Sequence, residues 1–145
     1  MLYTPQTKKA LKLCFEAHKD QLDKSGLPYV FHPFHLAEQM TNETTAVVAL
    51  LHDVIEDNDY TFDDLLAMGF DTAVVDALRL LTHDDDTPYM NYVAQIAETP
   101  IAKTVKLADL RHNSDLTRLD TVDEKALARR EKYIAAIAFL EQPSA

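Results

Sequence analysis

The segment 46–59, AVVALLHDVIEDND, places ionisable residues inside a run of apolar ones. His52 and Asp53 interrupt the apolar run, and Glu56 and Asp57 follow one helical turn later. Burying an imidazole and carboxylates among leucine and valine side chains is costly unless a partner compensates the polar groups. A local hydrogen bond is the simpler explanation for an isolated His-Asp pair, whereas a divalent cation would compensate both types of group.

Two more residues of these types stand in apolar surroundings: His32 just before a helix start in YVFHP, and Asp109 on the apolar helical face of VKLAD. Because neighbouring residues of a helix point about 100° apart, the His-Asp pair alone forms only one corner of a site. Two imidazoles and two carboxylates from three elements make a mixed nitrogen and oxygen site. Such a site suits Mn²⁺, Mg²⁺, Fe²⁺, Co²⁺ or Ni²⁺ better than a closed structural zinc site does. The alternatives are that His32 is only a helix-entry residue and that Asp109 pairs with Lys106 or Arg111.

Helix-start signals recur along the chain and predict that helices position these side chains. Hydroxyl N-caps followed by proline occur at Thr4-Pro5, Thr87-Pro88 and Thr99-Pro100, and Thr61 with Asp64 and Thr121 with Glu124 resemble capping boxes. Strand signals are weak, since there is no Asn-Gly or Asp-Gly hairpin and no sustained alternation of apolar and polar residues. We expect an all-α protein of about seven or eight helices. Its C-terminal helix, at about 121–140, should bury a stripe that includes Leu127 and Ile134.

Length and composition limit the classes of protein to which the chain can belong. With 145 residues, 47% of them hydrophobic, it is sized for one globular domain. The 24 acidic residues exceed the 14 basic ones, and a net charge of -10 argues against a protein that binds DNA or RNA. The two glycines form no phosphate-binding pattern, and the single cysteine, Cys14, excludes an internal disulfide. The N-terminus is not a signal peptide and no apolar run approaches the roughly 20 residues of a membrane span, so we expect a soluble cytoplasmic protein without a membrane partner.

The order of His32, His52-Asp53 and Asp109 resembles the H…HD…D signature of the HD-domain metal-dependent phosphohydrolases. Three longer stretches are similar to the hydrolase domain of RelA/SpoT-type enzymes and to the small alarmone hydrolases. KSGLPYVFHPFHLA resembles their KSGxPYxxHPxxVA, LLHDVIEDN resembles LLHDxxEDT, and VKLADLRHN resembles KLADRLHN. The likeness covers about residues 17–119, and three ordered blocks make it more specific than any one motif.

The resemblance implies a single HD hydrolase domain over 1–145, with the motifs in 17–119 and a C-terminal helix at 121–140. It implies hydrolysis of the 3′-pyrophosphate of guanosine or adenosine 3′,5′-bispyrophosphate (ppGpp or a relative), with release of pyrophosphate. The synthetase domain of the long enzymes has no room in 145 residues. The partner is then a nucleotide polyphosphate substrate, while the sequence says nothing of oligomeric partners.

The resemblance also implies a role for individual positions. The positions that match the metal ligands, usually of Mn²⁺ in this family, are His32, His52, Asp53 and Asp109. Glu56 and Asp57 match the acidic pair that orients or deprotonates the attacking water. Because a metal lowers the pKa of bound water and a carboxylate one turn away can accept the proton, the chemistry agrees with this assignment.

Other positions match residues that contact the nucleotide, and some depart from the family pattern. Lys24, Ser25 and Asn113 match contact positions. Asp23 stands where the family has an arginine that packs on the guanine ring, and Leu116 stands where it has a threonine. Since aspartate cannot stack on a base, we expect weak discrimination between guanine and adenine, and an Asp23→Arg variant should improve the use of ppGpp.

Two other functions remain open at this stage. One is an HD phosphohydrolase for another nucleotide or a phosphorylated metabolite, as Asp23 and Leu116 suggest. The other is a non-catalytic HD module that senses a nucleotide, which the intact set of acidic and histidine positions disfavours. His18 and His112 also fall at motif positions, and we interpret them as structural histidines away from the metal.

Overall fold

A computed structural model describes residues 1–57 and 59–143, and of Asp57 it describes only the backbone. Within these residues the chain forms nine α-helices and one short 3-10 helix, and no strand. Eight of the α-helices have six or more residues, which confirms the expected all-α fold. The elements are α1 (Pro5–His18), α2 (Phe31–Glu38), α3 (Glu43–Leu51), α4 (Val54–Asp57), α5 (Phe62–Ala67), α6 (Thr72–Leu81), α7 (Tyr89–Ala97), α8 (Pro100–Asn113), η1 (Leu116–Arg118) and α9 (Glu124–Leu140).

Helix α3 lies at the centre of the hydrophobic core. Every residue from position 45 to position 51 is buried, as expected for a helix that is apolar all round. The helix packs against α1, α2, α6 and α8. The Asn42 side chain caps its start by accepting a hydrogen bond from the Thr45 backbone N–H at 2.9 Å. The core therefore holds in place the end of α3 that carries the His-Asp pair.

The N-cap predictions are correct at most helix starts. Thr4 and Thr61 form capping boxes, and Thr99 is the N-cap of α8 with a proline in its first turn. Helix α7, in contrast, begins at Tyr89 with Pro88 as its N-cap, one residue later than Thr87 predicted.

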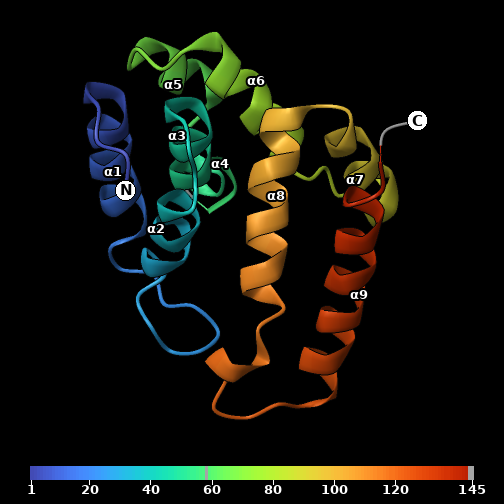
Figure 1. The fold of residues 1–145 in the computed structure, drawn as a ribbon. Coiled ribbons are helices and arrows are strands. Elements are labelled where there is room, and N and C mark those ends of the chain that lie inside the picture. Colours follow the sequence, from blue (N-terminus) through green and yellow to red (C-terminus); the bar gives the residue numbers. More distant parts are fainter. Residues whose placement is uncertain (58, 144–145) are drawn as a thin grey trace.

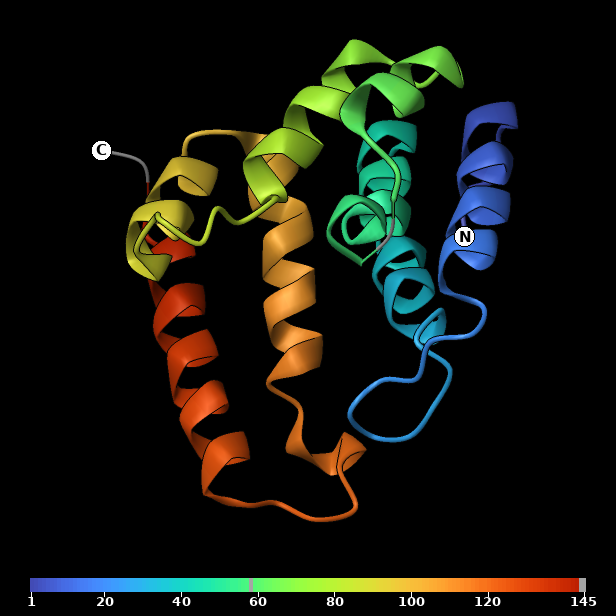
Figure 2. The same cartoon turned by 180° about the vertical axis from the view of Figure 1, so that it is seen from behind.

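The start of the C-terminal helix differs from the expectation. Helix α9 begins at Glu124 rather than at 121, because Asp123 is its N-cap and accepts a hydrogen bond from the Ala126 N–H at 2.8 Å. Helices α8 and α9 lie side by side (Figures 1 and 2), and α9 packs on α7 and α8. This packing leaves Leu127 at 48% and Ile134 at 42% exposure, so the prediction that both are buried is wrong.

The connection between α1 and α2 and the connection that carries η1 lie at the same end of the molecule (Figures 1 and 2). The first loop contains an isolated bridge between Leu22 and Pro28. Gly26 in its turn has a φ of 83°, in the left-handed region that favours glycine. Across the described residues, none of the helices has the length and apolar character that a membrane span requires.

Candidate metal and active site

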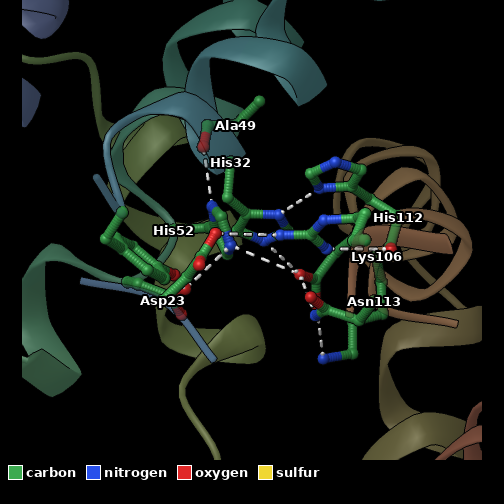
Figure 3. A network of polar contacts seen from close by, with 11 residues as sticks. Asp23, His32, Ala49, His52, Lys106, His112 and Asn113 are labelled. Atoms are coloured by element: carbon green, nitrogen blue, oxygen red, sulfur yellow. Dashed lines mark hydrogen bonds and ion pairs between the residues drawn. The ribbon is translucent and has the colours of Figure 1, made fainter. Parts of the chain in front are cut away.

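Three of the predicted ligands form a buried cluster. His32 comes from α2, His52 is the C-cap residue of α3, and Asp109 lies in α8. One ligand atom from each of the three side chains lies within 4.8 Å of the other two. Residues 77 positions apart in the sequence thus meet where three helices converge (Figure 3).

The orientation of His52 is set by the backbone of its own helix. Its Nδ1 lies 2.7 Å from the carbonyl oxygen of Ala49, to which it donates a hydrogen bond (Figure 3). A neutral ring then carries its lone pair on Nε2. That Nε2 is 3.0 Å from Asp53 Oδ2 and 3.5 Å from Asp109 Oδ1, yet it is buried and makes no hydrogen bond to a described residue.

Asp53, the fourth predicted ligand, lies beside this cluster rather than within the trio. Its Oδ2 accepts a hydrogen bond from the hydroxyl of Tyr29, and its side chain is 23% exposed. The Asp53 carboxylate therefore lies against both His52 and Tyr29 and is partly exposed.

Asp109, the third predicted ligand of the cluster, has three polar side-chain partners of its own besides His52 among the described residues. Its Oδ1 lies 2.9 Å from His32 Nε2 and accepts a hydrogen bond from Asn113 Nδ2 at 3.0 Å, while its Oδ2 pairs with Lys106 Nζ at 3.0 Å. Burial alone would raise the pKa of the Asp109 carboxyl, but Lys106 and His32 hold that pKa well below its usual range. Burial lowers the pKa of His32 despite its contact with Asp109, which favours the neutral imidazole that a metal ligand must be.

The chemistry of these groups fits a divalent cation. A buried imidazole lone pair that faces two carboxylate oxygens is unfavourable unless a positive charge lies between them. Two imidazole nitrogens and two carboxylates are suitable ligands for a first-row divalent ion. The ligands also have the outer hydrogen-bond partners that orient metal-binding side chains.

The predicted catalytic acids follow in α4. Glu56 is exposed, and its Oε1 accepts a hydrogen bond from the backbone N–H of His83 at 2.9 Å. This contact joins α4 to the segment that follows α6 and holds the carboxylate near the cluster. The side chain of Asp57 lies outside the described part of the structure.

A cavity of about 440 Å³ opens beside the cluster, between the α1–α2 loop, η1 and α9. All three predicted substrate-binding residues line it: Lys24, Ser25 and Asn113. Of the cluster, His32 reaches this cavity, and Asp53 and Glu56 line it as well. Three further lining residues carry groups that could bind a nucleotide and were not predicted from the sequence: Arg118, Arg129 and Tyr133. They lie on η1 and α9, outside the recognised motifs. Arg129 and Tyr133 are four residues apart on α9, a spacing that puts two side chains on neighbouring turns of one helix face.

Asp23 has a structural role in the wall of this cavity. Its Oδ1 accepts hydrogen bonds from the backbone N–H of Ser25 at 2.9 Å and of Leu27 at 3.1 Å, and from the Ser25 hydroxyl at 2.5 Å. Its Oδ2 forms an ion pair with Arg118 at 3.2 Å. Burial would raise the pKa of Asp23, but these hydrogen bonds and Arg118 lower it. Asp23 therefore closes its own turn and ties the loop to η1.

A second cavity, of about 180 Å³, lies against the other side of the cluster. It is lined by His52, Asp109 and Lys106, together with residues of α7. Asp53 and Glu56 line both cavities. The groups predicted to do the chemistry thus stand between two spaces that a substrate could fill.

His112 does not have the remote position that the sequence interpretation gave it. Its Nδ1 lies 2.6 Å from the Nδ1 of His32, so it touches a predicted metal ligand directly. Its spacing of three residues from Asp109 could have indicated this, because such residues share a helix face. Burial, Arg118 and His32 lower the pKa of His112 to about 4.

Comparisons with known proteins show which proteins the chain resembles. The chain is 35% identical over 127 residues to the human guanosine-3′,5′-bis(diphosphate) 3′-pyrophosphohydrolase, covering 78% of this chain and 70% of the human protein. It is 38% identical over 120 residues to the mouse enzyme of the same name, covering 72% and 66%. It is 30% identical over 144 residues to a probable GTP pyrophosphokinase of Mycobacterium leprae, covering 90% of this chain but only 18% of that protein. No family model matches the chain.

The chain belongs to the family of the guanosine-3′,5′-bis(diphosphate) 3′-pyrophosphohydrolases, which confirms the resemblance found in the sequence. A solved structure of a metazoan ortholog of SpoT, reported to hydrolyse ppGpp, superposes on the whole chain with a TM-score of 0.79 at 23% identity and is covered over 90% of its length. This likeness confirms the all-α fold.

Proposed function

We propose that this protein hydrolyses the 3′-pyrophosphate of guanosine or adenosine 3′,5′-bispyrophosphate and releases pyrophosphate. The observation that carries the proposal is the buried cluster of His32, His52 and Asp109, with Asp53 and Glu56 placed between two cavities. The family relationship supports the same reaction, since the human and mouse relatives are named for it. The cytoplasmic location expected from the sequence stays a prediction.

His32, His52, Asp53 and Asp109 would hold one divalent cation, and Mn²⁺ is the ion that we propose. A cation bound there supplies Lewis-acid chemistry, lowering the pKa of water and offsetting negative charge on the phosphoryl group. Lys106 keeps Asp109 ionised, and Ala49 keeps the lone pair of His52 on Nε2, so both ligands are ready to bind.

Glu56 is suited to accept the proton of the attacking water. Its carboxylate is exposed, borders both cavities and is held by the His83 N–H. In the reaction the water oxygen bonds to phosphorus, the bond from phosphorus to the 3′-oxygen breaks, and the 3′-oxygen gains a proton. Asp57 is proposed to assist from the same short helix.

The larger cavity offers the positive groups that a nucleotide polyphosphate needs. Lys24 and Arg129 line it on opposite elements, the α1–α2 loop and α9. Burial and the nearby charges of Arg129 and Lys132 lower the pKa of Lys24. Cations that repel one another favour the binding of an anion between them, which supports this cavity as the site of the nucleotide.

The proposal is tested by a substrate panel with Mn²⁺ present. The panel contains ppGpp, pppGpp, ppApp, nucleoside triphosphates and nucleoside monophosphates, and the products are separated and identified. We expect pyrophosphate and a nucleoside 5′-di- or triphosphate from the first three compounds only. Turnover of a triphosphate or monophosphate, with none of a 3′-pyrophosphate, would instead support an HD phosphohydrolase of different specificity. Binding of ppGpp without turnover would support a nucleotide-sensing module.

A further inference from the structure

His112 is the outer neighbour of His32 in the cluster (Figure 3). The two Nδ1 atoms are 2.6 Å apart and the ring planes differ by only 7°, as expected for a hydrogen bond in the plane of both rings. The ring of His35 packs on His112 with a centroid distance of 4.3 Å, and Arg118 donates a hydrogen bond to the His112 carbonyl oxygen at 2.9 Å. The imidazole of His112 is thus held in one place against His32.

The other proposed ligands are hydrogen-bonded by groups other than an imidazole. The backbone carbonyl of Ala49 accepts from His52, Tyr29 donates to Asp53, and Lys106 and Asn113 bind Asp109. For His32, the partner of the second ring nitrogen is an imidazole, which can accept or donate according to its tautomer.

The position of one proton decides whether His32 can bind a cation. Its Nε2 faces Asp109 Oδ1 at 2.9 Å, so this nitrogen is the one directed into the cluster. For Nε2 to present a lone pair, the ring proton has to be on Nδ1, and that N–H needs an acceptor. His32 is 2% exposed, so bulk water does not supply the acceptor. Among the described residues, the contact that Nδ1 makes is the one with His112 Nδ1.

We infer that His112 is a positioning residue for the metal site: its Nδ1 accepts the Nδ1 proton of His32 and so directs the His32 Nε2 lone pair toward the cation. The inference rests on the metal site of the proposed function. It assigns to His112 no contact with the substrate, and the residues that line the larger cavity do not include it. Loss of an outer partner of this kind typically weakens metal binding by about 10- to 100-fold.

The test measures the dissociation constant of Mn²⁺ for metal-free protein and three variants. His112→Phe keeps a planar ring but removes the acceptor, and we expect Mn²⁺ to bind about 10- to 100-fold more weakly. His112→Asn restores a side-chain oxygen that can accept, and we expect it to recover most of the lost affinity. His35→Phe is the matched control, because His35 packs on His112 but lies outside the cluster, and its Mn²⁺ affinity should equal that of wild type. Circular dichroism of the metal-free proteins checks that all three variants fold.

Three results with the variants would overturn the inference: His112→Phe binding Mn²⁺ as tightly as wild type, His112→Asn losing as much affinity as His112→Phe, or His35→Phe losing as much as either. If His112 had a purely structural role, the second result would be expected, because the acceptor oxygen of His112→Asn would then restore no Mn²⁺ affinity. A wild-type protein that binds no Mn²⁺ would overturn both the metal site and this inference. A wild-type protein that binds Mn²⁺ in a His112-dependent way but cleaves no 3′-pyrophosphate would reject the proposed substrate alone.

Discussion

The buried cluster and the rim of the larger cavity are built in different ways. In the cluster, the proposed ligands lie on or at the ends of α2, α3 and α8, and each has a partner that orients it. At the rim, Lys24 and Ser25 lie in a loop whose shape depends on Asp23 and whose position depends on the ion pair with Arg118. Helices packed on a core fix the reacting end, whereas a few polar contacts between loops fix the end that would hold the nucleotide.

This difference indicates where the molecule can change without losing its chemistry. His52 at the end of α3 can shift only if the packed core rearranges, because α3 is buried on all sides. A loop residue can be exchanged if another contact closes the loop, and the aspartate at position 23 is such an exchange relative to the family pattern. We therefore expect changes in the cluster to abolish the reaction and changes at the rim to alter its selectivity and Michaelis constant.

The largest effect is expected from removal of a ligand. The variants His52→Ala and Asp53→Ala should lose the metal and the activity together. A bound metal stabilises the folded state by mass action, so Mn²⁺ should raise the melting temperature of wild type but not that of either variant. Metal content and melting curves with and without Mn²⁺ measure both effects. Glu38→Ala is the control, since that exposed glutamate at the end of α2 lies outside the cluster. Full metal occupancy in either ligand variant would contradict the assignment of that ligand.

Removal of the proposed base should separate chemistry from metal binding. Glu56→Ala is expected to keep its metal and to lose turnover by a factor on the order of 10² or more, as for other general acid–base groups. The comparison is sharpened by Glu38→Ala, a change of an exposed glutamate at the end of α2 that should leave turnover unchanged. If Glu56→Ala turns over substrate at the wild-type rate, Glu56 is a surface acid without a part in the reaction.

The same contrast between helices and loops explains which features could be predicted from the sequence. His32, His52, Asp53 and Asp109 were recognisable because an ionisable residue in an apolar helical segment is conspicuous and because their order matches a family pattern. Arg129 and Tyr133 were not recognised, since α9 lies beyond the motifs and which of its faces borders the cavity depends on how it packs on α7 and α8. The contact between His32 and His112 joins residues 80 positions apart, and a sequence pattern does not report a distance of that kind.

A smaller effect is expected at the rim, and here the structure changes the expectation. The sequence alone suggested that Asp23→Arg improves the use of ppGpp. In the structure this change removes the acceptor of three loop hydrogen bonds and brings a second cation next to Arg118. We now expect the Michaelis constant for ppGpp to rise roughly tenfold, as for the loss of one or two hydrogen bonds, while turnover at saturation stays near that of wild type.

Asp20→Arg adds the same charge at an exposed position of the same loop and serves as the control. An unchanged or lower Michaelis constant in Asp23→Arg would show that the loop does not depend on Asp23. A rise of equal size in Asp20→Arg would trace the effect to charge alone.

The smallest effect is expected in the pH dependence of stability. The pKa of Asp23 is lowered in the folded protein, so its carboxyl stays ionised at a pH where the unfolded chain already binds a proton. Its contribution to stability is therefore present above the unfolded pKa of about 4 and is lost as the pH falls through the folded value. Melting temperatures of wild type should decline more steeply below about pH 4 than those of Asp23→Asn. Parallel curves for the two proteins would show that Asp23 does not contribute to acid sensitivity.

We propose that one cation held by His32, His52, Asp53 and Asp109 drives hydrolysis of a 3′-pyrophosphate. The most direct measurement titrates metal-free protein with Mn²⁺ and follows bound ion and released pyrophosphate from ppGpp in the same samples. We predict that pyrophosphate release rises in proportion to bound Mn²⁺ and levels off at one ion per chain, and that His52→Ala shows neither. Pyrophosphate release without bound metal, or release of single phosphates in place of pyrophosphate, would contradict the account.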